Sequence, residues 1–241
     1  MHETLIKNCQ ALLPEKVFSF CRLVEKHGGQ AIVVGGWVRD RIMHLPCHVS
    51  PDIDIEVFGI NYEILYRLCS NTIVAAYPHF GTLKTKDFDI SIPRVEHCCG
   101  KKYNDFHIQL LPNLPFDKAA QRRDFTINAI GWEPLNDKVL DPFNGIRSVS
   151  QRILTPITVA FKEDSSRILR AVQLIARFNF SPSQTLIQCG QAMSDDFIAP
   201  KHIALTLETL MRSNFQENAL RFLKTIGWDS MHKHIEQKLR A

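Results

Sequence analysis

The sequence of 241 residues has no apolar run close to the ~18 residues that cross a bilayer, and no signal-peptide pattern at its N-terminus. Repeats and low-complexity tracts are absent as well. Apolar residues make up 45% and charged residues 22%, as in ordinary globular proteins. These features predict a cytoplasmic protein with no membrane segment, long enough for one large domain or two small ones.

The cysteines do not form any recognisable pattern. There are seven, an odd number, and no two of them stand in a C-x-x-C pair. This pattern argues against both a disulfide framework and a structural zinc site. Reduced thiols, as in most cytosolic proteins, are the interpretation that fits best.

A strong charge of one sign is also lacking. The formal net charge is +4, which permits a polyanionic partner without requiring one. Residues 211–241 mix Lys, Arg and His with apolar residues. A solvated helix face explains this stretch slightly better than an RNA-binding face.

Hydrophobic periodicity divides the chain into a mixed first half and a helical second half. We expect an α+β head with a small mixed sheet over residues 1–155, followed by a wholly helical domain over 156–241. The expected strands are 31–34, 52–58, 80–86, 88–92 and 139–140. The expected helices are 4–28, 37–45, 61–70 and 119–130. The mixed composition of residues 97–118 predicts a mobile loop.

The most informative strand is acidic on one face. Because side chains alternate along a strand, Asp52, Asp54 and Glu56 share a face and their apolar neighbours share the other. Like charges at this spacing repel unless a cation lies among them, and Mg²⁺ prefers such hard oxygen ligands. Asp89, on a similar strand, is a candidate third carboxylate. A solvent-facing acidic strand is the alternative.

A glycine pair precedes this strand by about fifteen residues. Gly35 and Gly36 follow one expected strand and open an expected helix, where free N–H groups and close backbone approach favour a phosphate. Arg39 adds a forked donor, and Asp40 could orient it. A structural turn explains the glycines alone equally well. A phosphate cradle combined with a metal-binding strand, however, indicates two-metal phosphoryl transfer.

Four motifs in this order resemble the class II tRNA nucleotidyltransferases (CCA-adding enzymes) and bacterial poly(A) polymerases, members of the DNA-polymerase-beta-like superfamily. The resemblance covers roughly residues 30–180. The motifs are Gly35-Gly36-Trp37-Val38-Arg39-Asp40, Asp52-Ile53-Asp54, Arg122-Arg123-Asp124-Phe125-Thr126-Ile127-Asn128-Ala129 and Glu163-Asp164-Ser165-Ser166-Arg167.

The resemblance implies a polymerase-beta-like head with a five-stranded sheet, then a helical neck and a short body. It implies Mg²⁺ as cofactor, with tRNA, CTP and ATP as partners. Asp52 and Asp54 would be catalytic metal ligands, with Asp89 as the third catalytic candidate. The implied nucleotide-binding residues are Gly35, Gly36, Arg39, Arg123, Asp124, Asn128, Asp164, Arg167 and Arg170.

Within this set, the resemblance implies that Asp164 and Arg167 act as a protein template for the base. Cytosine and adenine each place an amino donor beside a ring-nitrogen acceptor, whereas guanine and uracil present a carbonyl and an N–H. A carboxylate beside a guanidinium therefore accepts C and A. The alternative is a solvated Glu163–Arg167 pair on a helix whose opposite face is apolar.

The sequence departs from the family in three places. Gln173 stands where members often carry an arginine, Ser148-Val149 replaces a common Asp-Leu, and only about sixty residues follow Phe180. A homo-oligomer is one way to compensate for so small a body. The ample 97–118 segment favours full CCA addition. The alternatives are A addition, CC addition, poly(A) synthesis or a non-catalytic RNA-binding module.

Overall fold

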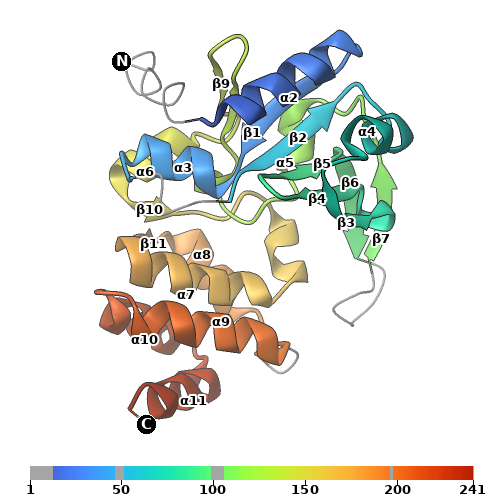
Figure 1. Ribbon diagram of the computed structural model, residues 1–241. Helices are drawn as coiled ribbons and strands as arrows, with labels where there is room; N and C mark the ends of the chain where they lie inside the picture. Colours follow the sequence, from blue (N-terminus) through green and yellow to red (C-terminus); the bar gives the residue numbers. More distant parts are fainter. Residues whose placement is uncertain (1–12, 47–51, 99–105, 196–197, 241) are drawn as a thin grey trace. The chain divides into compact units, whose positions relative to one another are not determined.

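The computed structural model describes residues 13–46, 52–98, 106–195 and 198–240 (Figure 1). Its contacts define two compact units. The first comprises residues up to 98, 106–123 and 127–149, and the second comprises 124–126 and 150–240. Each unit is described by itself. The domain division after residue 155 stays a prediction.

A mixed sheet forms the centre of the first unit and confirms the α+β fold expected from the sequence. Its order is β3-β4-β5-β2-β1-β8-β9, with β2 and β5 parallel and every other neighbouring pair antiparallel. The described residues therefore give seven strands where five were expected. The strands are β1 (Gln30–Val34), β2 (Asp54–Phe58), β3 (Ile73–Tyr77), β4 (Thr82–Thr85), β5 (Asp89–Ser91), β8 (Gly131–Glu133) and β9 (Lys138–Leu140).

Apolar spacing explains how the helices of this unit pack. Helix α2 (Glu15–Lys26) buries Val17, Phe20, Cys21 and Val24, which recur every three or four residues, and it packs against β1 (Figure 1). The remaining helical segments are α3 (Gly36–Ile42), α4 (Tyr62–Cys69), α5 (Phe116–Ala120) and the 3₁₀ turns η2 (Pro78–Phe80) and η3 (Thr126–Asn128).

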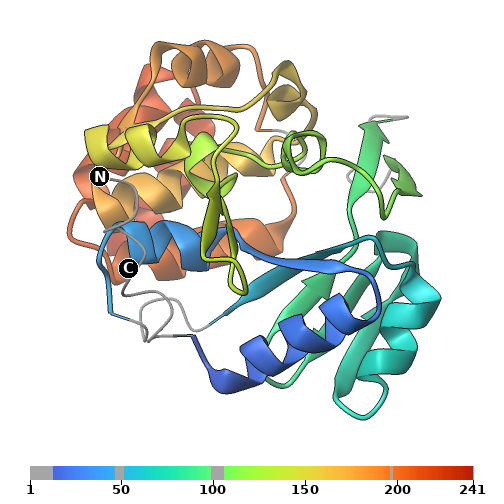
Figure 2. The same ribbon diagram turned by 90° about the horizontal axis from the view of Figure 1, so that it is seen from above.

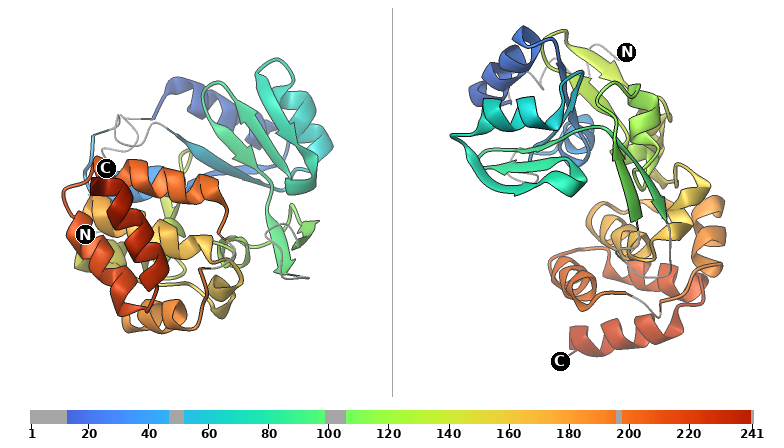
Figure 3. Two further views of the ribbon diagram at one scale, coloured as in Figure 1. Left: turned by 90° about the horizontal axis from the view of Figure 1, so that it is seen from below. Right: turned by 90° about the vertical axis from the view of Figure 1, so that its right-hand side faces the viewer.

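Two expectations between residues 97 and 130 are wrong. Strands β6 (Arg94–Cys98) and β7 (Phe106–Leu110) form an antiparallel hairpin that extends away from the main sheet (Figures 2 and 3), where a loop was expected. The helix expected over 119–130 ends at Ala120. Asp124 Oδ1 accepts the N–H of Phe125 at 2.8 Å, a local bond that competes with continuing helix.

The second unit is helical, apart from a two-residue strand pair formed by β10 (Ile153–Leu154) and β11 (Ser181–Pro182). Helix α7 lies at its centre and buries Ile168, Ala171, Val172 and Ile175, the apolar stripe expected from the sequence. Helices α9 and α10 lie between α7 and α11 (Figure 1). The helical segments are η4 (Val159–Glu163), α7 (Ser166–Phe178), α8 (Gln184–Gln191), α9 (Pro200–Met211), α10 (Gln216–Thr225) and α11 (Asp229–Arg240), while α6 (Gly145–Gln151) spans the boundary.

None of the helices in the described ranges combines the length and the apolar character that a membrane crossing demands.

Candidate functional site

Three carboxylates lie at one end of the central strands. Asp54 is the first residue of β2 and is the register partner of Asp89 on the parallel strand β5, so both side chains share a face of the sheet. Asp52 precedes the strand and is exposed. Loss of solvent raises the pKa of Asp54, opposed by Arg123 and reinforced by the charges of Asp89 and Asp52. Two neighbouring negative charges thus make a cation favourable here.

Asp89 already has a cation beside it. Lys84 Nζ lies 2.9 Å from Asp89 Oδ2, and this hydrogen bond is the main reason that the pKa of Lys84 is raised. Asp52 and Asp54 are therefore the stronger candidates for metal ligands. Among the residues with described positions, no group of three His, Cys, Asp or Glu forms a metal-binding cluster. A pair of carboxylates completed by substrate phosphates nevertheless suits Mg²⁺.

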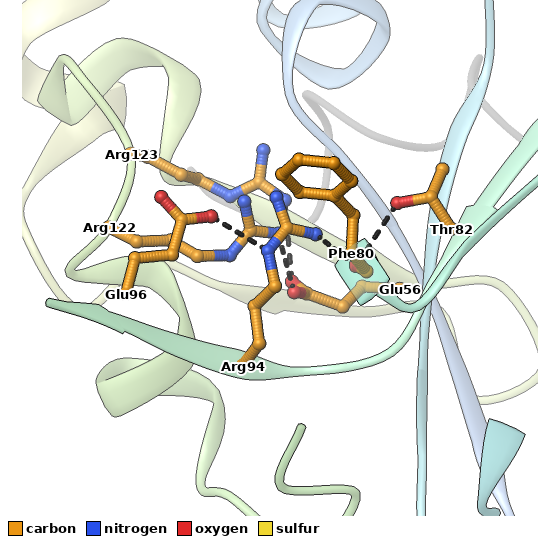
Figure 4. Close-up of polar contacts among 7 residues, drawn as sticks. All are labelled: Glu56, Phe80, Thr82, Arg94, Glu96, Arg122 and Arg123. Atoms are coloured by element: carbon orange, nitrogen blue, oxygen red, sulfur yellow. Dashed lines mark hydrogen bonds and ion pairs between the residues drawn. The ribbon is translucent and has the colours of Figure 1, made fainter. Parts of the chain in front are cut away.

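The acidic strand continues into the core, where Glu56 is fully buried. Arg122 Nη2 donates to Glu56 Oε1 at 2.8 Å, and Arg123 Nη2 lies 3.3 Å from Oε2 (Figure 4). Burial alone would raise the pKa of Glu56, but the two arginines outweigh it and lower that pKa. At Glu56, therefore, the charge of the acidic face is neutralised by two arginines and not by a metal ion. Sequence reasoning missed this pairing because the partners lie 66 and 67 residues away.

Gly35 brings the backbone against the carboxylates. It has φ 76° and ψ −140° and lies between the end of β1 and the start of α3 at Gly36. A Cβ at this position would lie 3.3 Å from Asp54 Oδ2 and 3.4 Å from Arg123 Nη1. The fold therefore brings Gly35, Asp54 and Arg123 together, and the positive φ explains why glycine is favoured here.

Replacing Gly35 with alanine is expected to lower both stability and activity. The positive φ should cost about 1–3 kcal/mol of unfolding free energy, and the new methyl group should displace Asp54 or Arg123. Gly28→Ala is the matched control, because Gly28 has φ +80° but nothing within 4 Å of its Cβ position. Denaturant melts should show similar losses for both variants, with activity reduced further only for Gly35→Ala. Equal activities would contradict a role for close approach at Gly35.

Arg39 is held in a buried network. Its Nε donates to Asp40 Oδ1 at 2.7 Å, as expected from the sequence, and its Nη1 donates to Asn128 Oδ1 at 2.7 Å. Only 6% of the Arg39 side chain is exposed. The network ties α3 to the turn that contains Asn128 and leaves only a small part of the guanidinium open to a ligand.

The second unit contains the other predicted nucleotide-binding residues. Arg170 Nε donates to Asp124 Oδ2 at 2.6 Å, pairing a half-exposed arginine with a buried aspartate. Asp164 lies just before α7: its Oδ1 accepts the Ser166 N–H at 2.9 Å, and its carbonyl accepts the N–H of Arg167 at 3.1 Å. Asp164 and Arg167 are both half-buried. Their side chains thus lie at the start of a buried helix and remain partly accessible.

The guanidinium of Arg167 has a neighbour in η4. Its Nη1 donates to the carbonyl of Ala160 at 3.0 Å, which restrains the side chain beside the start of α7. Glu163, the partner in the alternative interpretation, belongs to η4 and not to α7. The bond to Ala160 supports a positioned guanidinium at this point.

The contacts of Gln173, one of the departures from the family pattern, give it a role in packing. Its Nε2 donates to Thr206 Oγ1 of α9 at 2.9 Å, and Thr206 is fully buried. Thr206 in turn donates to the carbonyl of His202 at 2.8 Å. Gln173 therefore joins α7 to α9, a packing role for which an amide is suited.

The chain is similar to proteins of one known family. The profile of the poly(A) polymerase head domain matches residues 31–155. A multifunctional CCA protein of Xylella fastidiosa is 31% identical over 204 residues, which are 82% of this chain and 47% of the relative. A multifunctional CCA protein of Mannheimia succiniciproducens is 31% identical over 209 residues, 87% of this chain and 45% of the relative. The chain thus spans about half the length of these curated relatives.

Solved structures show the same fold. The Bacillus stearothermophilus CCA-adding enzyme in complex with CTP has a TM-score of 0.70 at 23% identity, with 87% of this chain and 51% of that chain covered. The Thermotoga maritima CCA-adding enzyme complexed with tRNA has a TM-score of 0.66 at 22% identity, with 92% and 52% covered. The polymerase-beta-like head expected from the sequence is confirmed by these matches.

Family membership implies the use of a divalent metal ion, which agrees with the carboxylates that converge at the start of β2. The matched profile, which covers more than half of the chain, and the curated relatives agree with the motif order. The chain belongs to the poly(A) polymerase head-domain family, which includes the class II CCA-adding enzymes.

Proposed function

We propose that this protein is a tRNA nucleotidyltransferase that adds C and A to the tRNA 3′ end from CTP and ATP, without a nucleic-acid template and with release of pyrophosphate. The observation that carries the proposal is the convergence of Asp54 and Asp89, in register, with Gly35 and Arg123. Asp52 adds a further charge at the same place. A cytoplasmic location and a homo-oligomeric state stay predictions.

The proposed metal is Mg²⁺, held by Asp52 and Asp54. Bound there, it would supply activation of the 3′-hydroxyl and charge stabilisation on the triphosphate. Asp54 must be deprotonated to act as a ligand; burial raises its pKa, and the charge of the neighbouring Arg123 works against that rise. Glu56 holds Arg123 in place, and the absence of a side chain at Gly35 lets the backbone approach Asp54 and Arg123 closely.

We propose further roles for the remaining predicted residues. The N–H of Gly36 and the small exposed part of the Arg39 side chain would bind the triphosphate, with Asn128 holding Arg39. Arg123 would contact the phosphates. Asp124 and Arg170, joined by their ion pair, would contact the nucleotide's sugar and phosphates as one unit.

Base selection is proposed to depend on Asp164 and Arg167. Replacing Arg167 with alanine should reduce the preference for CTP and ATP over GTP and UTP about tenfold or more, because a paired donor and acceptor discriminate by about 1–3 kcal/mol. Competition between labelled nucleotides on one tRNA measures this ratio. Arg177→Ala is the control, since Arg177 is an exposed arginine of the same helix. Unchanged selectivity in Arg167→Ala would contradict the template role.

A primer-extension assay tests the proposed function. Purified protein with Mg²⁺ receives tRNA that ends in the discriminator base, in C or in CC, with each nucleoside triphosphate separately. Addition of C to the first two substrates and of A to the third supports the proposal. Addition of only C, or of only A to CC-ended tRNA, identifies a specialised enzyme, and no addition to any RNA favours a non-catalytic RNA-binding module.

A further inference from the structure

An exposed aromatic pair lies at the edge of the sheet. Tyr77 is the last residue of β3 and Phe80 ends the turn η2, and each is 46% exposed. The ring of His79 lies edge-on to that of Phe80 at 5.1 Å between centroids. Core packing does not account for aromatic residues at these two positions, since both side chains keep almost half of their surface in solvent.

The backbone of Phe80 is held firmly. Its carbonyl accepts a hydrogen bond from Arg94 Nη1 at 2.8 Å and another from Thr82 Oγ1 at 3.3 Å (Figure 4). Pro78 opens the turn, and Gly81 closes it with φ 59°. An exposed aromatic side chain on a rigid turn loses little conformational freedom when a ligand covers it.

The sheet register puts Tyr77 on the same face as the proposed catalytic carboxylates. Asp54, Asp89 and Lys84 form one row across β2, β5 and β4. Glu56, Ser91 and Thr82 form the next row, and Tyr77 is the register partner of Thr82. Residues two apart on a strand share a face, so Tyr77 lies on the carboxylate face, about three strand spacings of ~4.8 Å from β2.

Arginines lie close to the turn, and Arg94 bonds to it directly. Figure 4 shows the guanidinium groups of Arg94, Arg122 and Arg123 beside the ring of Phe80. Within this group, Glu96 accepts from Arg94 at 2.7 Å and Glu56 pairs with the other two arginines. The charge of Asp54 also acts on Arg122 and Arg123, so the arginines are held among carboxylates on this face.

We propose that Phe80, assisted by Tyr77, stacks an unpaired nucleobase at the 3′ end of the RNA substrate. Aromatic faces next to arginines are the usual platform for single-stranded RNA, and stacking accepts any base. A platform on the carboxylate face holds the end of the strand near the residues that act on its 3′-hydroxyl. The inference rests on the proposed function, because it assumes an RNA 3′ end as the substrate.

The test uses tRNA carrying 2-aminopurine as its 3′-terminal base, whose fluorescence falls when the base stacks on an aromatic ring. Wild-type protein should quench the probe, Phe80→Leu should lose most of the quenching and bind the tRNA about tenfold more weakly, and Phe80→Tyr should keep both. Tyr66→Leu is the control, because Tyr66 is 45% exposed but lies on α4. Equal quenching by wild type and Phe80→Leu would overturn the inference.

Extension of unmodified tRNA, measured on the same proteins, separates this inference from the proposed function. Quenching that depends on Phe80 without any extension by the wild type would support the stacking site and contradict nucleotide addition. Extension with quenching that is independent of Phe80 would contradict the stacking site alone. Circular dichroism and a urea melt confirm that Phe80→Leu is folded, as expected for an exposed position.

Discussion

Replacing Asp54 with asparagine is expected to reduce nucleotide addition by about a thousand-fold or more, with little change in tRNA binding. Asparagine keeps the size of the side chain but removes the charge at the point where Asp52 and Asp89 also converge. Removal of a negative charge from a repulsive group should leave stability unchanged or slightly higher. Single-turnover extension and tRNA affinity, measured on the same preparation, separate the two effects.

The matched control for this variant is Asp87→Asn. Asp87 is also an aspartate of the first unit, but it is half-exposed and forms a surface ion pair with Lys16 at 2.8 Å. Loss of that pair should cost at most about 1 kcal/mol and leave activity unchanged. An Asp54→Asn protein that adds nucleotides at the wild-type rate would remove this carboxylate from the proposed mechanism.

Replacing Glu56 with alanine is expected to lower the free energy of unfolding by about 3–5 kcal/mol. The substitution leaves Arg122 and Arg123 close together with no carboxylate between them, and breaking a buried pair from one side is strongly destabilising. Urea denaturation at neutral pH measures the change. Activity should fall as well, because Arg123 loses the partner that orients it beside Asp54.

The loss should depend on pH in a defined direction. The pKa of Glu56 is lowered in the folded protein, so its contribution is present above the ordinary glutamate pKa of about 4.3 and is lost as the pH falls through the folded value. The difference in unfolding free energy between wild type and Glu56→Ala should therefore shrink below about pH 4. A difference that is small and constant with pH would mean that the two ion pairs contribute little.

Local patterns were sufficient to predict the elements that carry the site. The short apolar run before Gly35 predicted β1, the acidic alternation predicted β2, and the apolar spacing after residue 165 predicted α7. A buried strand reads as an apolar or alternating run and an amphipathic helix as a stripe, so each of these patterns is visible in the sequence. The family resemblance added the polymerase-beta-like architecture, which the comparisons confirm.

Features that depend on distant partners could not be predicted in the same way. The acidic pattern did not reveal that Glu56 would be buried, because its neutralising arginines come from a segment beyond the hairpin. The hairpin itself was missed because turn-forming residues in 97–105 conceal the alternation of its strands. The helix expected over 119–130 ends at Ala120, and beyond it the side chain of Asp124 bonds to the local backbone.

The measurement that tests the central claim most directly is the intact mass of a tRNA lacking its terminal CCA after incubation with the protein, Mg²⁺, CTP and ATP. The proposed function predicts a single product, heavier by two cytidylates and one adenylate, that does not grow further on longer incubation. A ladder of adenylate additions would identify a poly(A) polymerase. A tRNA of unchanged mass, with folded protein that still binds it, would contradict nucleotide addition altogether.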